Sequence, residues 1–420
     1  MILSSGDFEF ASFVRPGDLV VCGQGTSEPL TLTRKLVAEK GRIGPFTCFL
    51  GAVFSDTFAP ASTDGIAFRG YGAIGSGAAL SRAGRLDVLP WHYSRIDEAF
   101  ATGALRADVV LLQLAPPPAG RGGYSLSLAN DYAASAARHA RVVVAEVNPH
   151  APWTHGAALP DGVVPDVLVA ADAPPQELRS ARYGDVEERI AHHVAALVPD
   201  GACLQFGVGA TPVAAMSGLA GHRDLGIHSG VIGDVCVDLI AAGVITNEWK
   251  PFDQGVSVAN TVFGTRRLFD HVANNPAVEI RPASHTHGHR TIAAIPDFRA
   301  INSAVEVDLT GQVNAEVAGG NYVGAVGGQV DFVRGALASE GGRSVIALPA
   351  TALGGSATRI VPRVDTVTLP RSDADLVVTE YGVADLRGAT LSERAERMIA
   401  IAAPAFREDL ARAWRDGGKS

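Results

Sequence analysis

The sequence lacks several features that would assign it to a class at once. It has no block of basic residues and carries a net charge of −9, so nucleic acids and anionic membranes are not expected as partners. No apolar run is long enough to cross a bilayer. The N-terminus, MILSSGDFEF, has no basic region followed by an apolar one, so we expect no signal peptide. Together these absences favour a cytoplasmic protein.

Cysteine is also scarce. The chain has 4 cysteines, and they lie far apart with no Cys-x-x-Cys pair (Cys22, Cys48, Cys203 and Cys236). This spacing is typical of small buried apolar residues and not of a disulfide framework or a cysteine metal site.

Apolar residues and glycine are abundant. The length of 420 residues suggests two or three domains, and hydrophobic residues make up 47% of the chain. The 47 glycines indicate many tight turns. Apolar runs of strand length alternate with helical patterns. This alternation predicts an α/β fold with mostly parallel sheets flanked by helices.

The second half of the chain echoes the first. Three glycines recur with the same mutual spacing, and a proline closely follows each set (Gly17, Gly23, Gly25 with Pro29; Gly201, Gly207, Gly209 with Pro212). We expect two similar α/β domains, 1–183 and 184–420, joined by the Pro-rich segment 174–184. A chance similarity is the alternative.

The most informative stretch is 204–254. An apolar run at 202–206 leads into Gly207, Gly209 and a helical pattern. A strand that enters a Gly-x-Gly turn and a helix presents free backbone N–H groups, where a phosphate can bind. A tight turn without a ligand is the alternative. A second glycine-rich turn leads into a helix at 321–334.

These segments resemble, in order and over nearly the whole chain, the acetyl-CoA hydrolase/transferase family, which includes the 4-hydroxybutyrate CoA-transferases. The segments that carry the resemblance include Glu28-Pro29, Ala145-Glu146-Val147-Asn148, Thr154-His155-Gly156, Gly207-Val208-Gly209, Asn274-Asn275-Pro276, Gly327-Gly328-Gln329 and Thr379-Glu380-Tyr381-Gly382. The resemblance implies two α/β domains with the active site in the cleft between them, and a homodimer.

The resemblance also implies a ligand and a set of contacts. The substrates would be an acyl-CoA and a small carboxylic acid, and we expect no covalently bound cofactor. Residues that match the coenzyme A contacts of the family are Gly207, Val208, Gly209, Ala210, Thr211, Val305, Gly327, Gly328 and Gln329. Two further segments are candidate walls of the acyl pocket, 91–93 and 54–58.

The sequence departs from the family at the nucleophile. Family members use a glutamate that attacks the thioester and forms a covalent glutamyl-CoA intermediate. The matching position, after His228-Ser229, is Gly230, and the next acidic residue is Asp234. Glycine has no side chain and cannot act as this nucleophile.

Three accounts of the chemistry stay open. In the first, which the sequence favours, the protein is a CoA-transferase with a relocated carboxylate, Glu28 or Asp56. In the second it is an acyl-CoA hydrolase, with water activated by a histidine or a carboxylate. In the third it binds an acyl-CoA without turnover.

For the hydrolase, His228 is one candidate base. His285, His287 and His289 are others, expected on one side of an extended segment, with a pKa near the reference value of about 6.5. These three could also form a zinc site, although we assign no metal. A dinucleotide-dependent oxidoreductase is disfavoured because both Gly-x-Gly turns lack the third glycine of the Rossmann fingerprint.

Overall fold

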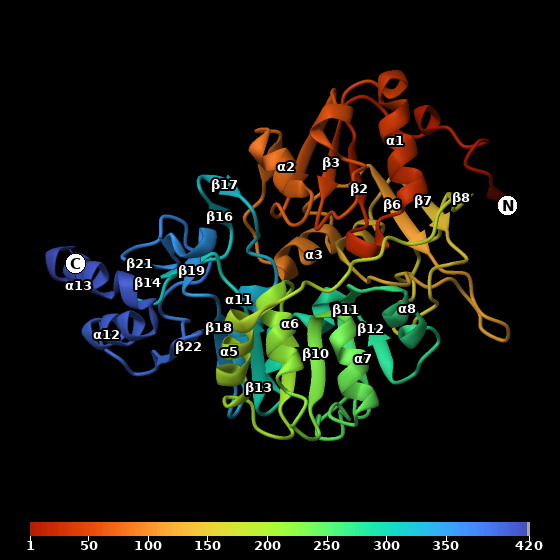
Figure 1. The fold of residues 1–420 in the computed structure, drawn as a ribbon. Coiled ribbons are helices and arrows are strands. Elements are labelled where there is room, and N and C mark those ends of the chain that lie inside the picture. The colour runs from red at the N-terminus through yellow and green to blue at the C-terminus, as the bar shows by residue number, and fades with distance from the viewer. Residues whose placement is uncertain (418–420) are drawn as a thin grey trace.

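A computed structural model describes residues 1–417. Figure 1 shows the first half of the chain, red to yellow, packed against the second half, green to cyan, with the C-terminal segment in blue at one side. Each half is built on one large sheet with helices on its faces.

The first sheet has eight strands, and every neighbouring pair is parallel. In spatial order they are β1 (Ile2–Leu3), β8 (Val167–Ala170), β7 (Val142–Val147), β6 (Val109–Leu114), β2 (Leu19–Cys22), β3 (Phe46–Leu50), β4 (Ile66–Gly70) and β5 (Leu86–Val88).

The second sheet also has eight strands, and its neighbours are parallel except for the final hairpin. In spatial order they are β12 (Val278–Ile280), β11 (Ser257–Val262), β10 (Gly226–Ile232), β9 (Cys203–Phe206), β13 (Phe298–Asn302), β18 (Arg343–Ala347), β22 (Leu376–Thr379) and β23 (Gly382–Asp385).

The two sheets share one topology. In each half, one strand leads into a Gly-x-Gly turn: β2 in the first half and β9 in the second. On one side of this strand lie β3, β4 and β5 in the first half, and β10, β11 and β12 in the second. On its other side lie β6, β7 and β8 in the first half, and β13, β18 and β22 in the second. The shared order confirms the predicted fold class of two similar, mostly parallel α/β units. No helix or strand interrupts 171–184, which contains the predicted domain limit.

Thirteen α-helices occur in the part of the chain that the structure describes. They are α1 (Leu30–Ile43), α2 (Gly77–Arg82), α3 (Tyr93–Ala101), α4 (Tyr132–Ala136), α5 (Asp185–Ala195), α6 (Ala210–Ser217), α7 (Asp234–Ala241), α8 (Arg266–Val272), α9 (Ala283–Thr286), α10 (His289–Ala293), α11 (Gln329–Ala338), α12 (Leu391–Ile401) and α13 (Arg407–Gly417). Across residues 1–417, no helix combines the length and apolar character that a membrane crossing requires.

Short strands complete the second half. They form small sheets beside the main one: β14 (Glu306–Asp308) with β15 (Val313–Asn314) and β21 (Ile360–Val361), β16 (Val317–Ala318) with β17 (Asn321–Tyr322), and β19 (Thr351–Ala352) with β20 (Ala357–Thr358).

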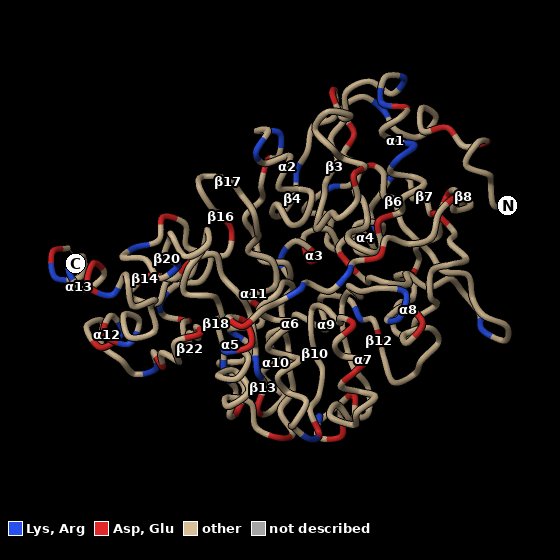
Figure 2. The backbone as a smooth tube through the Cα atoms, viewed as in Figure 1, with Lys and Arg blue, Asp and Glu red and all other residues tan. Residues whose placement is uncertain are grey.

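One apolar core runs through both halves. The central strands are buried on both faces, as parallel sheets between helices require, and β6 is buried at every position. Leu128 and Tyr132 of the first half belong to the same buried cluster as Leu204 and Ile227 of the second. The four cysteines are free and buried, as predicted. Acidic and basic residues are interspersed along the chain, with no block of one sign (Figure 2).

Candidate active site

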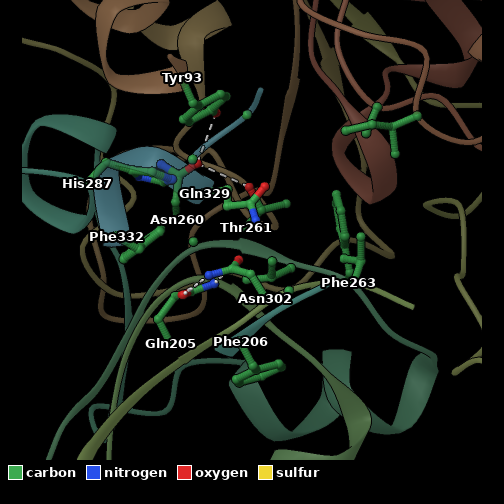
Figure 3. A pocket seen from close by; sticks show the side chains of 18 of the residues that line it. Tyr93, Gln205, Phe206, Asn260, Thr261, Phe263, His287, Asn302, Gln329 and Phe332 are labelled. Atoms are coloured by element: carbon green, nitrogen blue, oxygen red, sulfur yellow. Dashed lines mark hydrogen bonds between the residues drawn. The ribbon is translucent and has the colours of Figure 1, made fainter. Parts of the chain in front are cut away.

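A cavity of about 160 Å³ lies between the two halves, where strands of both sheets end. β9 contributes Phe206, β10 contributes Gly230 and β11 contributes Asn260, while Gln24 and Ala52 follow β2 and β3. The carboxyl ends of parallel strands are where α/β folds bind ligands. The cavity therefore lies where the fold positions a ligand site, and Figure 3 shows its side chains.

Hydrogen bonds across this cavity tie the halves together. Tyr93 of α3 donates its hydroxyl to Asn260 Oδ1 (3.0 Å) and accepts from Gln24 Nε2 (3.0 Å). Gln24 Oε1 in turn accepts from the Tyr71 hydroxyl (2.6 Å) and the Ala52 amide (3.1 Å). This network fixes polar side chains from both halves against one another, and Figure 3 shows its Tyr93–Asn260 bond.

A second set of amides lines the opposite wall. Gln205 and Asn302 bond reciprocally through their carboxamides at 3.1 and 3.0 Å, so each fixes the other's orientation. Gln329, the first residue of α11, is buried, and its Nε2 has no hydrogen-bond partner. A buried donor without a partner is costly. Gln329 therefore has a donor free for an oxygen of a bound ligand.

The cavity wall holds neither a carboxylate nor a cationic side chain among residues 1–417. At Gly230, the position expected for the family nucleophile, an added Cβ would lie 3.1 Å from His287 Nε2 and 3.3 Å from Phe332 Cε2. At Gly328 an added Cβ would lie 2.6 Å from the same imidazole. Two glycines thus make room for the ring of His287.

His287 is held in an apolar environment. Its ring centroid lies 4.8 Å from that of Tyr93 and 4.6 Å from that of Phe332, and Nδ1 lies 2.9 Å from the Thr286 hydroxyl. No described residue hydrogen-bonds its Nε2. Burial lowers the pKa of His287 to about 3, so the imidazole is neutral at physiological pH.

The three neighbouring histidines do not lie on one side of an extended segment, so that expectation was wrong. Residues 283–286 form α9 and α10 starts at His289, because Pro282 stands at the N-cap of the first turn and Gly288 stands at that of the second. His287 lies in the cavity wall, His285 lies beside Asp253 (3.0 Å), and His289 is exposed.

A second cavity of about 320 Å³ adjoins the first, and residues such as Gly207, Val208 and Phe263 line both. Its wall includes Arg179, from the segment between the halves. It also includes Gly209, which precedes α6 with φ +114°, a conformation that residues with a side chain rarely adopt. Because the two cavities share wall residues, their combined lining extends from Gly209 and Val213, at the start of α6, to Gly230.

Six of the predicted coenzyme A contacts line these cavities: Gly207, Val208, Gly209, Gly327, Gly328 and Gln329. Ala210 and Thr211 continue into α6 and Val305 immediately precedes β14, and none of the three is in either wall. Of the candidate acyl-pocket segments, Tyr93 lines the first cavity and Phe54 the second.

The predicted catalytic residues lie elsewhere. Glu28 is buried outside both walls, where Thr33 donates to its Oε1 (2.8 Å), and burial raises its pKa. Asp56 is exposed. His228 is fully buried behind the first cavity, and burial is the main reason that its pKa falls to about 3. Burial therefore favours the neutral form of both imidazoles, His228 and His287, well below the reference pKa of about 6.5.

Several wall residues were not identified from the sequence. Gln205, Asn260 and Asn302 are buried polar residues within or at the end of the fully buried strands β9, β11 and β13. A buried polar residue in such a strand is a usable signal, since burial without a partner or a function is unfavourable. Which of them meet across the cavity depends on the packing of both sheets.

Comparison with known proteins gives this site its context. A sequence model of the acetyl-CoA hydrolase/transferase C-terminal domain matches residues 264–414. The 4-hydroxybutyrate coenzyme A transferase of Clostridium kluyveri is 42% identical over 332 residues, which is 78% of this chain and 77% of the relative. The chain belongs to the acetyl-CoA hydrolase/transferase family.

Other relatives agree with this assignment. The crystal structure of RipA from Yersinia pestis superimposes with a TM-score of 0.90 at 33% identity, covering 97% of this chain and 95% of RipA. An acetyl-CoA hydrolase of Yarrowia lipolytica is 29% identical over 58% of this chain and 46% of its own length. These relatives are enzymes of two kinds, CoA-transferases and an acetyl-CoA hydrolase.

The short distance between an added Cβ at Gly230 and the His287 ring leads to a prediction about the free energy of unfolding. Gly230→Glu alone should destabilise the fold by about 1–3 kcal/mol, because the new Cβ crowds the imidazole. Gly230→Glu combined with His287→Asn should recover at least about 1 kcal/mol of this loss, since the smaller amide vacates the space. Urea unfolding of the wild type, both single variants and the double variant measures the coupling. Strictly additive losses would show that the two positions do not compete for space.

Proposed function

We propose that this protein hydrolyses acyl-CoA thioesters, with coenzyme A lying along the two joined cavities. The Gly207–Gly209 turn and Arg179 would receive its phosphates in the second cavity, and the thioester would reach Gly230 in the first. Two observations support this proposal. The two cavities share part of their walls, and six of the predicted coenzyme A contacts line one or both of them.

One observation carries the choice of hydrolysis. Among residues 1–417, the wall of the first cavity has no carboxylate to attack the thioester, and an imidazole occupies the space beside the glycine at the nucleophile position. Asp234 lies in the wall of the second cavity, where its carboxylate accepts from the amide and hydroxyl of Thr265. A CoA-transferase of the usual kind needs the carboxylate, whereas a hydrolase needs an oriented water and a proton acceptor. His287 Nε2 is available for the second role.

The hydrogen bonds of Thr286 bear on this role. Its hydroxyl donates to the Pro282 carbonyl (3.3 Å), which leaves the oxygen able to accept from His287 Nδ1 (2.9 Å). In that tautomer the Nε2 lone pair faces the cavity and can accept a hydrogen bond from water. Tyr93 and Phe332 hold the ring, so the acceptor keeps one direction.

The proposed reaction balances without a covalent enzyme intermediate. The water oxygen forms a bond to the thioester carbon, and the carbon–sulfur bond breaks. One water proton passes through His287 to the leaving thiolate, which departs as the thiol, and the product acid loses the other proton to solvent. The free donor of Gln329 is suited to the oxygen on which negative charge develops. Because each proton that Nε2 accepts is passed on, the imidazole need not remain charged.

CoA transfer by a relocated carboxylate is the second candidate. Glu28 has one observation in its favour, since its Oε2 is buried without a hydrogen-bond partner. It would have to leave its site beside Thr33 to reach the cavity. Binding of an acyl-CoA without turnover is the third candidate, and the experiments below separate all three.

Substitution of Arg179 tests whether coenzyme A binds along the second cavity. Arg179→Gln should weaken CoA binding about threefold to tenfold and reduce its dependence on salt, because Arg179 lines the second cavity and no described residue forms an ion pair with its charge. Calorimetric titration with CoA measures the affinity. Arg182→Gln is the matched control, since that arginine lies on the same segment outside the wall. Equal affinities in both variants would contradict the proposed path.

His287 tests the chemistry. His287→Gln should lower the rate of thiol release from acyl-CoA by at least about 100-fold, with CoA affinity changed little, because the proton acceptor is lost. Thiol release is followed with a thiol reagent, and the exposed His289→Gln is the control. Turnover in His287→Gln at the wild-type rate would rule out this role.

The pH dependence follows from the lowered pKa. Protonation removes the Nε2 lone pair, but with a pKa of about 3 the imidazole stays neutral from pH 8 down to about 5. The rate of thiol release in wild type should therefore be flat over this interval, as long as circular dichroism shows the fold intact. A fall with a midpoint near 6.5 would mean that the catalytic base has an ordinary pKa.

Covalent trapping distinguishes the relocated nucleophile. If a protein carboxylate forms a thioester with CoA, borohydride reduction after mixing with acyl-CoA should modify one peptide, and those containing Glu28 and Asp56 are the first to examine. We expect no modified peptide together with free thiol. A modified Glu28 or Asp56 would establish the transferase mechanism, and neither thiol nor modification would indicate binding alone.

A further inference from the structure

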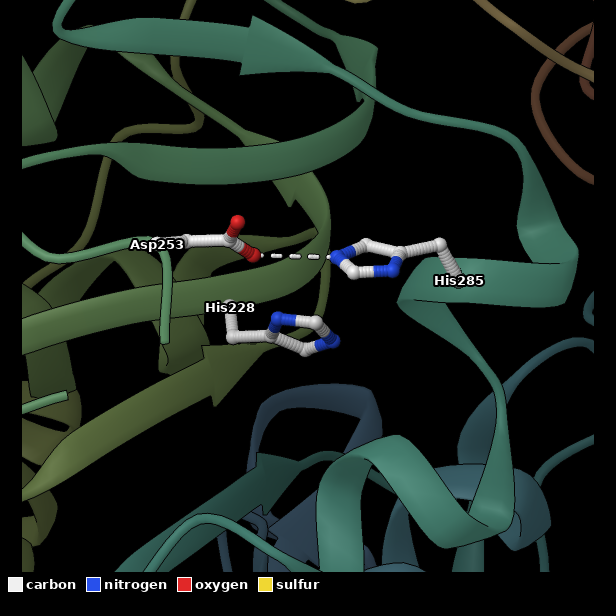
Figure 4. A group of neighbouring side chains, drawn as sticks. All are labelled: His228, Asp253 and His285. Atoms are coloured by element: carbon white, nitrogen blue, oxygen red, sulfur yellow. Dashed lines mark hydrogen bonds and ion pairs between the residues drawn. The ribbon is translucent and has the colours of Figure 1, made fainter. Parts of the chain in front are cut away.

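Behind the first cavity, three potential metal ligands converge from separate parts of the second half. His228 comes from β10, Asp253 from the loop before β11, and His285 from α9. One ligand atom of each lies within 4.8 Å of the other two. Figure 4 shows the three side chains facing a common point.

The hydrogen bonding of His228 points to a missing ligand. Its Nε2 lies 3.1 Å from the Thr286 carbonyl oxygen, and a carbonyl can only accept, so Nε2 carries the proton. Nδ1 therefore carries a lone pair, in a side chain with no exposed surface, and no described residue donates to it. This lone pair is directed toward Asp253 and His285 (Figure 4).

The other two groups make this arrangement unfavourable as it stands. His285 Nε2 lies 3.0 Å from Asp253 Oδ2 and can donate to it. The lone pair of His228 then faces a carboxylate that is also an acceptor. Other buried imidazole nitrogens lack partners as well, but among residues 1–417 only His228 belongs to a group with two further ligand atoms so close. A bound cation would satisfy all three groups at once.

We propose that His228 Nδ1, His285 Nε2 and Asp253 Oδ2 bind a divalent transition metal of the Zn²⁺ type. Two imidazoles and one carboxylate are a common donor set for zinc, and the bond from His228 Nε2 to a carbonyl is the outer contact that orients a metal-binding imidazole. The side chains of Asp253 and His285 remain 16% and 27% exposed, so water can fill the fourth position.

Two positively charged side chains near the proposed site reduce its affinity for a metal ion, but they do not occupy its ligand atoms. Arg281 lies 3.7 Å from Asp253 Oδ1, so it engages the carboxylate oxygen that the proposed site does not use. The Lys250 ammonium is held by the carbonyl oxygens of Ile227 (3.1 Å) and Val256 (2.7 Å). Both charges lower the affinity for a bound cation, but neither side chain occupies one of the three proposed ligand atoms.

A metal at this site would influence the first cavity through Thr286, which contacts both His228 and His287. Thr286 accepts from His228 through its carbonyl and contacts His287 through its hydroxyl, while His285 precedes it. A metal joining His228 to His285 would therefore fix α9 against β10 and hold His287 beside Gly230. This consequence rests on the proposed function, whereas metal binding itself does not.

The test uses the full chain, stripped with a chelator and titrated with ZnCl₂ by calorimetry. We expect one equivalent of zinc to bind, a rise in melting temperature with zinc, and visible absorption typical of four-coordinate cobalt when Co²⁺ replaces it. Asp253→Asn and His285→Asn should each weaken zinc binding by at least about 100-fold. Asp253 has φ +53°, which asparagine also tolerates, so its backbone should not change.

The exposed His289→Asn is the matched control and should bind zinc as the wild type does. Absence of stoichiometric zinc binding by the wild type, or unchanged binding in folded Asp253→Asn and His285→Asn, would overturn the proposal. None of these measurements involves acyl-CoA. The metal site and the hydrolase can therefore fail separately.

Discussion

The imidazole of His287 and a side chain at position 230 compete for the same space. An added Cβ at Gly230 would lie 3.1 Å from His287 Nε2, and one at Gly328 would lie 2.6 Å from the same ring. Interiors are close-packed, so a ring enters such a site only where other atoms are absent. The missing carboxylate and the neutral imidazole are thus two sides of one packing constraint, and the chemistry of the cavity depends on it.

The surrounding fold makes this constraint rigid. Tyr93 from the first half and Phe332 from the second hold the His287 ring between them, and the Tyr93–Asn260 hydrogen bond ties the same two halves. Gln205 and Asn302 fix each other's orientation, and the described part of the chain places no Asp, Glu, Lys or Arg in the wall of the first cavity. An uncharged polar wall of this kind favours a thioester and water over a carboxylate nucleophile of the protein.

The fold was largely predictable from the sequence, for physical reasons. Buried parallel strands are continuous apolar runs, and the glycines that follow them repeat in both halves because each half turns at the same strand end. The glycine-rich turns at 207–209 and 327–328 were found in the same way, since helix N-termini beside glycines have a local signature. Both turns line the joined cavities.

The positions of the candidate catalytic groups could not be predicted from local sequence. Alternating histidines at 285, 287 and 289 resembled a strand, but Pro282 and Gly288 divide the segment into short helices and direct the three rings differently. Glu28 follows a glycine turn, yet its burial beside Thr33 depends on the packing of α1. The contact of His287 with Gly230 joins segments far apart in the sequence. Only the packed sheets reveal it.

The source of the oxygen in the product acid tests the central claim most directly. A single turnover of acyl-CoA with excess enzyme in ¹⁸O-labelled water, followed by mass spectrometry of the acid and of the protein peptides, distinguishes the nucleophiles. If water held by His287 attacks the thioester, every product molecule should carry one ¹⁸O and no peptide should gain label. Label in a glutamate or aspartate peptide after the first turnover, with unlabelled acid, would show that a protein carboxylate attacks and would contradict the account.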